Sequence, residues 1–132
     1  MAYWILKTEP STYSFADLVK AGRAVWDGVT NPVAVKNIKA MAIGDELMIY
    51  HTGSEKAAVG FAKVVKAPYP DPKNPKVSVV EIAAGHPIRV PVTLAAVKAS
   101  PEFAKFDLVR LPRLSVIPVP VKWWWKLVSM GA

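Results

Sequence analysis

The sequence predicts a mixed α/β protein of the α+β type, with five or six strands in a mostly antiparallel sheet and three or four short helices. The chain has 132 residues, 52% apolar and 20% charged, which is typical of a chain that folds around one core. Twelve prolines and seven glycines are scattered along it, which favours many short elements over a long helical bundle. Strands this numerous in a short chain tend to curl into a small barrel without exposed edges.

The first thirty residues predict one strand and one helix. Residues 3–7 are aromatic and β-branched, so they are expected to form a strand that ends before Pro10. Ser14 is a typical N-cap residue for a short helix that Gly22 closes. The Asp-Gly pair at 27–28 then predicts a turn.

A second helix is expected to begin at Pro32, with Asn31 as its cap. Its apolar side chains recur at i, i+4 and i+7 and form a face for the core: Ala34, Ile38 and Met41. Lys36 and Lys39 lie three residues apart on another face, where they are free to meet solvent or phosphate.

The next part of the chain predicts a hairpin and further strands. Residues 46–51 and 57–66 are expected to pair across a turn at Gly53. The proline-rich residues 68–75 are expected to form a stiff loop. Three more strands are expected, at residues 76–84, 89–92 and 114–119.

Two more helices are predicted near the C-terminus. Thr93 is suited to cap the first, and Pro120 to begin the second. The last helix directs an apolar face to the core: Trp124, Leu127 and Val128. Because consecutive helical residues point about 100° apart, residues 123–125, all tryptophan, cannot all be buried, and at least one ring is expected to be partly exposed.

Charge and composition restrict the classes of function. Seventeen Lys and Arg against ten Asp and Glu give a net charge of +7, which favours nucleic acid or another anionic surface as a partner. The absence of cysteine excludes a disulfide, a thiol nucleophile and a zinc site with cysteine ligands. With only His51 and His86 to supply imidazole, neither a metal nor a cofactor is expected.

The N-terminus has only a short apolar run before Lys7, too short for a signal peptide, and no apolar stretch in the chain is long enough to span a membrane. We therefore expect a cytoplasmic monomer that has no membrane partner.

Catalytic motifs are absent: the chain has no nucleophile elbow, no P-loop and no dinucleotide-binding glycine motif. His51 could act as a base near Ser54, although a lone histidine at a strand end is more often structural. The sequence therefore favours a binding protein over an enzyme.

Aromatic and polar residues gather at the ends of the predicted elements. Trp26 stands just before a turn and a helix N-terminus, where its ring would offer a stacking surface beside backbone N–H groups. A tryptophan at such a position is more often a core residue beneath the helix, and the pattern alone favours that interpretation. Arg113 and Ser115 at the start of a strand likewise fit either a surface position or a polar site.

In chain order, six motifs resemble the EVE domain family. They are residues 3–10 (YWILKTEP), 26–31 (WDGVTN), 44–45 (GD), 50–52 (YHT), 69–72 (YPDP) and 113–116 (RLSV). The resemblance spans nearly the whole chain, so residues 1–132 are expected to form a single EVE domain. It implies a PUA-like fold, a curled β-barrel flanked by helices and related to the YTH and ASCH domains. It also implies the binding of a modified base in DNA or RNA through an aromatic-lined pocket.

The resemblance also implies roles for single residues. Trp26 would stack on the base and Asn31 would read its Watson–Crick edge, while Lys36 and Lys39 would attract the nucleic-acid backbone. Further residues are expected to line the pocket or to meet sugar and phosphate: Lys7, Thr30, Tyr50, His51, Arg113 and Ser115.

Two positions and one segment depart from the family pattern, the segment being residues 32–36, which lack an arginine often found there. Thr30 stands where arginine is common and Ile117 where glutamine is frequent, so phosphate affinity or ligand choice could differ from other members. Two alternatives to a reader of modified bases stay open at this point. One is an enzyme that processes a free modified nucleotide, and the other is an RNA-associated scaffold module.

Overall fold

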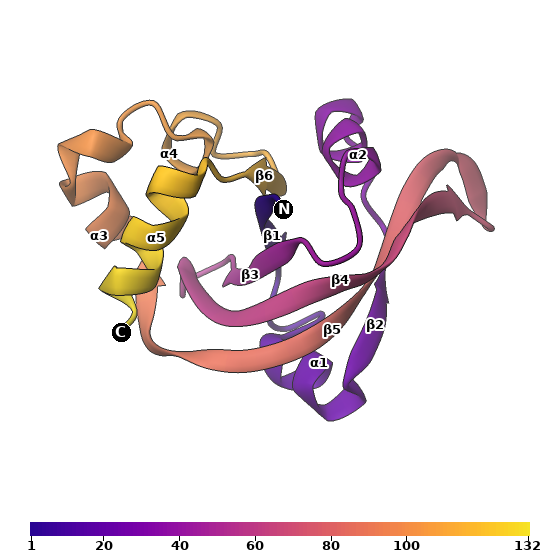
Figure 1. Cartoon of the computed structure of the whole chain (residues 1–132), viewed down its shortest axis with the longest axis horizontal. Coiled ribbons are helices and arrows are strands. Elements are labelled where there is room, and N and C mark those ends of the chain that lie inside the picture. The colour runs from indigo at the N-terminus through magenta and orange to yellow at the C-terminus, as the bar shows by residue number, and fades with distance from the viewer.

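The computed structural model describes all 132 residues and contains one six-stranded sheet, in the order β2-β5-β4-β3-β1-β6 (Figure 1). The strands are β1 (Tyr3–Thr8), β2 (Arg23–Trp26), β3 (Glu46–His51), β4 (Ala57–Asp71), β5 (Asn74–Thr93) and β6 (Val116–Pro118). The helices are α1 (Phe15–Ala21), α2 (Pro32–Lys39), α3 (Leu94–Ala99), α4 (Asp107–Arg110) and α5 (Val121–Met130), with a 3-10 turn, η1, at Pro101–Phe103. No helix has both the length and the apolar character needed to cross a membrane.

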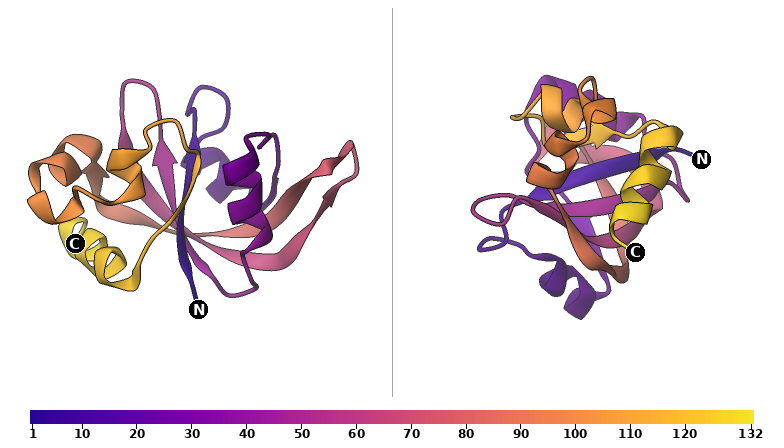
Figure 2. Two further views of the ribbon diagram at one scale, coloured as in Figure 1. Left: turned by 90° about the horizontal axis from the view of Figure 1, so that it is seen from above. Right: turned by 90° about the vertical axis from the view of Figure 1, so that its left-hand side faces the viewer.

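The predicted fold class is confirmed. The sheet is mixed and mostly antiparallel, because β1 and β3 form its only parallel pair. It curls strongly, and the long strands β4 and β5 run across the full width of the molecule (Figures 1 and 2). The curl does not close into a barrel, since β2 and β6 at the two ends of the sheet are not paired with each other.

A core of 30 buried residues fills the curl of the sheet. The helices α3, α4 and α5 gather at one end of the molecule, and α2 lies toward the other end, beside the β4–β5 hairpin (Figures 1 and 2). The two ends of the molecule therefore present different surfaces.

The helix starts follow the predicted local signals. Ser14 caps α1 in a capping box with Asp17, and Gly22 ends that helix with a φ of 78°. Asn31 caps α2 and Pro32 is its first residue, as expected. Thr93 caps α3 by accepting a hydrogen bond from the N–H of Ala96.

The prediction of a stiff loop at residues 68–75 is wrong. Strand β4 continues to Asp71 and β5 begins at Asn74, so only Pro72 and Lys73 form the turn between them. Prolines fit here because their φ is compatible with an extended strand. Register shifts along this part of the β4–β5 pair mark bulges, and Pro68 lies within one of them, between Lys66 and Tyr69.

Other differences arise from long-range pairing. The strands expected at 76–84 and 89–92 are parts of one continuous strand, β5. Strand β2 has only four residues and is defined by its pairing with β5, which no local pattern announces. The short helix α4 and the turn η1 were not expected from the sequence, and β6 is shorter than its predicted range.

The tryptophan run on α5 is divided as predicted. Trp124 is buried and stacks on Tyr3 with 4.6 Å between ring centres, whereas Trp125 is 56% exposed. Trp123 is partly buried against Phe106. The expectation that one ring reaches solvent is confirmed.

Candidate functional site

The loop between β2 and α2, residues 27–31, lies among three hollows on the surface. Gly28 lines a hollow of about 450 Å³ together with Trp26. Thr30 lines a second, of about 530 Å³, and Asn31 a third, of about 330 Å³. The turn depends on Gly28, whose φ of 77° falls in the left-handed region that favours glycine. Four of these five residues thus line three depressions, which we call the base hollow, the lysine groove and the arginine hollow.

The base hollow is lined by Trp26, Tyr13, Thr8 and residues around them. The indole of Trp26 is only 8% exposed and packs edge-on against the Tyr13 ring, with 6.1 Å between ring centres. The Thr8 hydroxyl donates a 2.6 Å hydrogen bond to the Tyr13 carbonyl, which fixes Tyr13 at the rim. Trp26 is therefore mainly a core residue, and a strip of its ring forms one wall of the hollow.

Asn31 caps helix α2, and this leaves only part of its side chain available to a ligand. Its Oδ1 accepts hydrogen bonds from the N–H groups of Val33 at 2.9 Å and Ala34 at 3.1 Å, which caps α2. Its Nδ2 has no partner in the protein, and the residue is exposed. The side chain can therefore donate to an acceptor on a ligand, while its oxygen is already engaged.

Lys7 and Tyr50 are neighbours on the paired strands β1 and β3. The Lys7 ammonium lies 5.5 Å from the centre of the Tyr50 ring and donates a 3.1 Å hydrogen bond to the carbonyl of Pro112 in the arginine hollow. Burial lowers the pKa of Lys7 and raises the pKa of Tyr50 from their ordinary values. The backbone N–H of Lys7 also donates to the Ser115 carbonyl at 2.9 Å, so β1 holds the segment before β6 in place.

His51 was predicted to line the pocket, and the structure gives it a structural role. Its Nε2 accepts a 3.0 Å hydrogen bond from the N–H of Phe15 at the start of α1. Its Nδ1 donates to the Glu55 carboxylate at 2.7 Å. With 8% of the residue exposed and both nitrogens bonded to the protein, His51 has no free nitrogen for a ligand.

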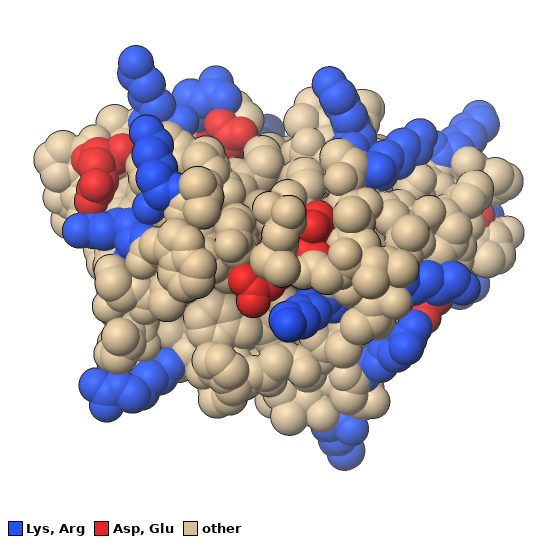
Figure 3. Space-filling model, viewed as in Figure 1, with Lys and Arg blue, Asp and Glu red and all other residues tan.

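The lysine groove is strongly basic. Lys36 and Lys39 of α2 line it, and across it lie Asn74 and Lys76 of β5. None of these three lysines forms an ion pair. In Figure 3, Lys and Arg side chains project over α2 and the adjoining hairpin. The sequence predicted the two helix lysines but not the two β5 residues, because only the extended hairpin brings β5 to this groove.

The arginine hollow brings Asn31 together with Arg113, whereas Trp26 and Thr30, predicted for the same pocket, line the other two hollows. Arg110 lies in the same hollow, but its guanidinium is paired with Asp107 at 2.7 Å. Arg113 forms no ion pair and is exposed, so it is the free cation of this hollow.

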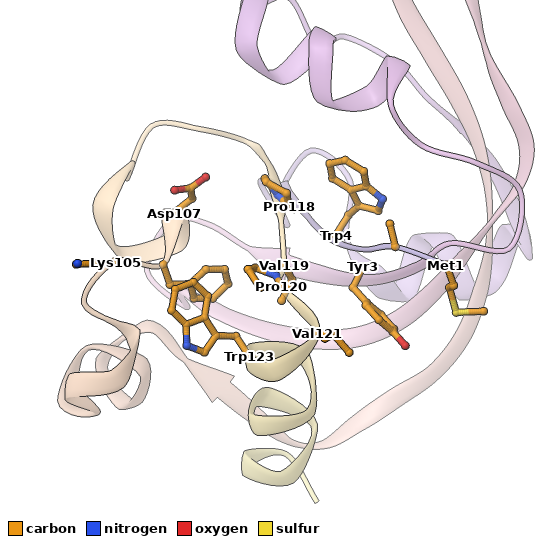
Figure 4. A pocket seen from close by; sticks show the side chains of 12 residues that line it. Met1, Tyr3, Trp4, Lys105, Asp107, Pro118, Val119, Pro120, Val121 and Trp123 are labelled. Atoms are coloured by element: carbon orange, nitrogen blue, oxygen red, sulfur yellow. The ribbon is translucent and has the colours of Figure 1, made fainter.

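The largest cavity, about 700 Å³, lies at the other end of β1 (Figure 4). Tyr3, Trp4 and Trp123 are among its lining residues. The Trp4 Nε1 donates to Asp45 and Asp107 is paired with Arg110, while the Lys105 ammonium and the Tyr3 hydroxyl have no partner in the protein. At about 3.3 Å per strand residue, the five steps from Tyr3 to Thr8 place this cavity roughly 17 Å from the base hollow.

Similarity to known proteins covers nearly the whole chain. The family model "EVE domain" matches residues 2–130. The NMR structure of Rpa0253 from Rhodopseudomonas palustris is 41% identical, with a TM-score of 0.94, over 99% of this chain and 93% of that one. The crystal structure of the human THYN1 protein in complex with 5-methylcytosine-containing DNA is 25% identical, with a TM-score of 0.89, over 99% of this chain and 98% of that one.

A curated relative and a further solved structure add to these matches. Thymocyte nuclear protein 1 of Mus musculus is 36% identical over 81 residues, which are 52% of this chain and 36% of that protein. The match thus spans about a third of the length of this curated relative. An ASCH protein from Zymomonas mobilis, 18% identical with a TM-score of 0.58 over 98% of this chain and 95% of that one, shares the fold alone. The fold is therefore PUA-like, and, on the match over residues 2–130, the chain belongs to the EVE domain family.

Proposed function

We propose that this protein binds a modified nucleobase in DNA or RNA, without chemical turnover, at the base hollow beside the β2–α2 loop. The observation that carries this proposal is the meeting of three hollows at residues 27–31, which supply an aromatic wall, an amide donor and unpaired cations. The likeness to a human protein solved with 5-methylcytosine-containing DNA supports the same ligand class.

The base enters the hollow after leaving the stack, a step that costs least in a single strand. The exposed strip of Trp26 and the Tyr13 ring form an apolar wall for it. The free Nδ2 of Asn31 donates to a carbonyl oxygen or ring nitrogen on the base edge. Arg113 and Lys7, on the other side of Asn31, meet sugar or phosphate.

Binding without turnover is favoured by the state of the titratable groups. His51, the only histidine among the predicted pocket residues, uses both nitrogens within the protein. A general base needs a free nitrogen or carboxylate within hydrogen-bond reach of the substrate. Asp27 is the only carboxylate that lines the base hollow, and the other lining side chains are hydroxyl, aromatic and aliphatic, so no histidine or second carboxylate lines the hollow to form an acid–base pair with it.

We expect the protein to prefer a strand that carries one 5-methylcytosine over the matched unmodified strand by about tenfold to 200-fold. Burying one methyl group in an apolar pocket contributes about 1–3 kcal/mol, which sets this range. The measurement is a pair of fluorescence-anisotropy titrations at one fixed salt concentration. Equal affinities would contradict the proposal and leave an RNA-associated scaffold as the better reading. Turnover of a free modified nucleotide would instead favour an enzyme.

Lys36 and Lys39 are expected to contribute attraction that does not depend on sequence or modification. The double variant Lys36→Gln, Lys39→Gln should weaken binding of modified and unmodified strands by the same factor. It should also lower the slope of log affinity against log salt by about one to two, since each lost phosphate contact on a single strand removes about 0.7. A salt slope equal to that of the wild-type protein would place both lysines outside the interface.

A further inference from the structure

We propose that the lysine groove, between α2 and the β4–β5 hairpin, holds the phosphodiester backbone on one side of the modified base. The ligand is then a strand with nucleotides on that side, not a free nucleoside. This proposal rests on the proposed function and adds to it that the ligand carries further nucleotides on one particular side of the modified base.

The groove offers hydrogen-bond donors and positive charge, and no carboxylate lines it. Two lysines come from α2, Lys36 and Lys39, and a third, Lys76, comes from β5 on the facing wall. Asn74 accepts a hydrogen bond from the N–H of Lys76 through its Oδ1, which leaves its Nδ2 free to donate. Thr30 adds a hydroxyl at the end near the loop. This set matches an anion with several acceptor oxygens, such as a phosphodiester.

The donors extend along both walls over more than one phosphate. Lys36 and Lys39 are three residues apart on α2, a rise of about 4.5 Å. Asn74 and Lys76 are two residues apart on β5, on the same face of the strand and about 6.6 Å apart along it. A groove of about 530 Å³ with cations on two elements therefore fits a run of backbone better than a single ion.

The groove adjoins the base hollow directly. Gly28 lines the base hollow and Thr30 lines the groove, and two residues span at most about 7 Å of chain. A strand whose base occupies the hollow can therefore pass its next phosphates over the loop into the groove. On the other side of the loop, the arginine hollow offers one unpaired lining cation, Arg113, with the Lys7 ammonium held on the Pro112 carbonyl, against three unpaired lysines in the groove. The backbone should be held more strongly on the side of the groove.

The experiment uses two single-stranded hexanucleotides that differ in whether the one 5-methylcytosine stands at the 5′ or the 3′ end, with matched unmodified strands. The proteins are the wild type, Lys76→Gln and, as a control, Lys73→Gln. Lys73 is exposed in the turn of the same hairpin and does not line the groove.

The wild-type protein should bind one of the two placements at least about threefold more tightly than the other. Lys76→Gln should weaken the preferred placement by about two- to fivefold, the range of an exposed ion pair, and leave the other placement unchanged. Lys73→Gln should preserve the preference. Equal affinity for the two placements, or an equal loss for both in Lys76→Gln, would overturn the proposal that the groove holds the backbone. The proposed function would still stand in that case if the protein prefers modified over unmodified strands. Loss of that second preference would overturn the proposed function itself.

Discussion

Replacing Trp26 by alanine should lower the free energy of unfolding by about 3–5 kcal/mol, the usual cost of removing a large buried aromatic side chain. Trp26 is 8% exposed, belongs to the core and packs edge-on against Tyr13. Urea denaturation followed by circular dichroism measures the loss. A change below about 1 kcal/mol would mean that the ring contributes little to the core and stands free for a ligand.

The binding role of Trp26 is separated from its structural role by Trp26→Leu, which keeps an apolar side chain in the core. Stacking of a base on an aromatic ring contributes about 1–3 kcal/mol, so the folded variant should bind the modified strand about tenfold more weakly or worse. Trp125→Ala is the matched control, because Trp125 is a 56% exposed tryptophan on α5 and does not line the base hollow. A folded Trp26→Leu protein with unchanged affinity would leave Trp26 a structural residue only.

The second large effect is expected at Asp45, which the sequence marked only as part of the GD motif at residues 44–45. Asp45 is 3% exposed, and its carboxylate accepts three hydrogen bonds of 3.0 Å, from the N–H groups of Ala2 and Ala42 and from the indole of Trp4. Asp45→Ala leaves these donors without an acceptor at about 1–3 kcal/mol for each one that stays buried. We expect a loss of about 3–5 kcal/mol in the free energy of unfolding.

Asp45→Asn serves as the comparison, because the amide keeps one acceptor oxygen and should lose less stability than Asp45→Ala. Both variants should bind the modified strand normally once folded, since Asp45 lies at the end of β1 away from the base hollow. If Asp45→Ala were as stable as the wild-type protein, water would be able to replace the carboxylate at all three donors.

Local signals in the sequence account for much of the fold. The caps Ser14, Asn31 and Thr93 each act on backbone groups within three residues, so their effect can be read from neighbouring letters. The β4–β5 hairpin could not be read in this way. Its prolines, Pro68 and Pro70 among them, are usual in loops, and only the bulged pairing with β5 makes them acceptable in a strand.

In the candidate site too, residues close in sequence could be predicted together, whereas those brought together by the fold could not. Trp26, Asn31 and Thr30 are consecutive or nearly so, and their motif predicted that they belong together. Lys76 joins the lysine groove only because β5 folds back beside α2, a relation between distant parts of the chain. Sequence reasoning also could not show that His51 accepts a hydrogen bond from the start of α1. Only the structure shows that this bond engages its Nε2 and that capping α2 engages the Asn31 oxygen.

The measurement that tests the central claim most directly is an NMR titration of the ¹⁵N-labelled protein with a short single strand that carries one 5-methylcytosine. The chain has five tryptophans, so five indole N–H signals report on separate places in one experiment. The account predicts that the largest shift changes fall on the Trp26 indole, the Asn31 side-chain amide and the backbone of residues 27–31. Largest changes at Trp123 and Tyr3, which line the cavity in Figure 4, would contradict it.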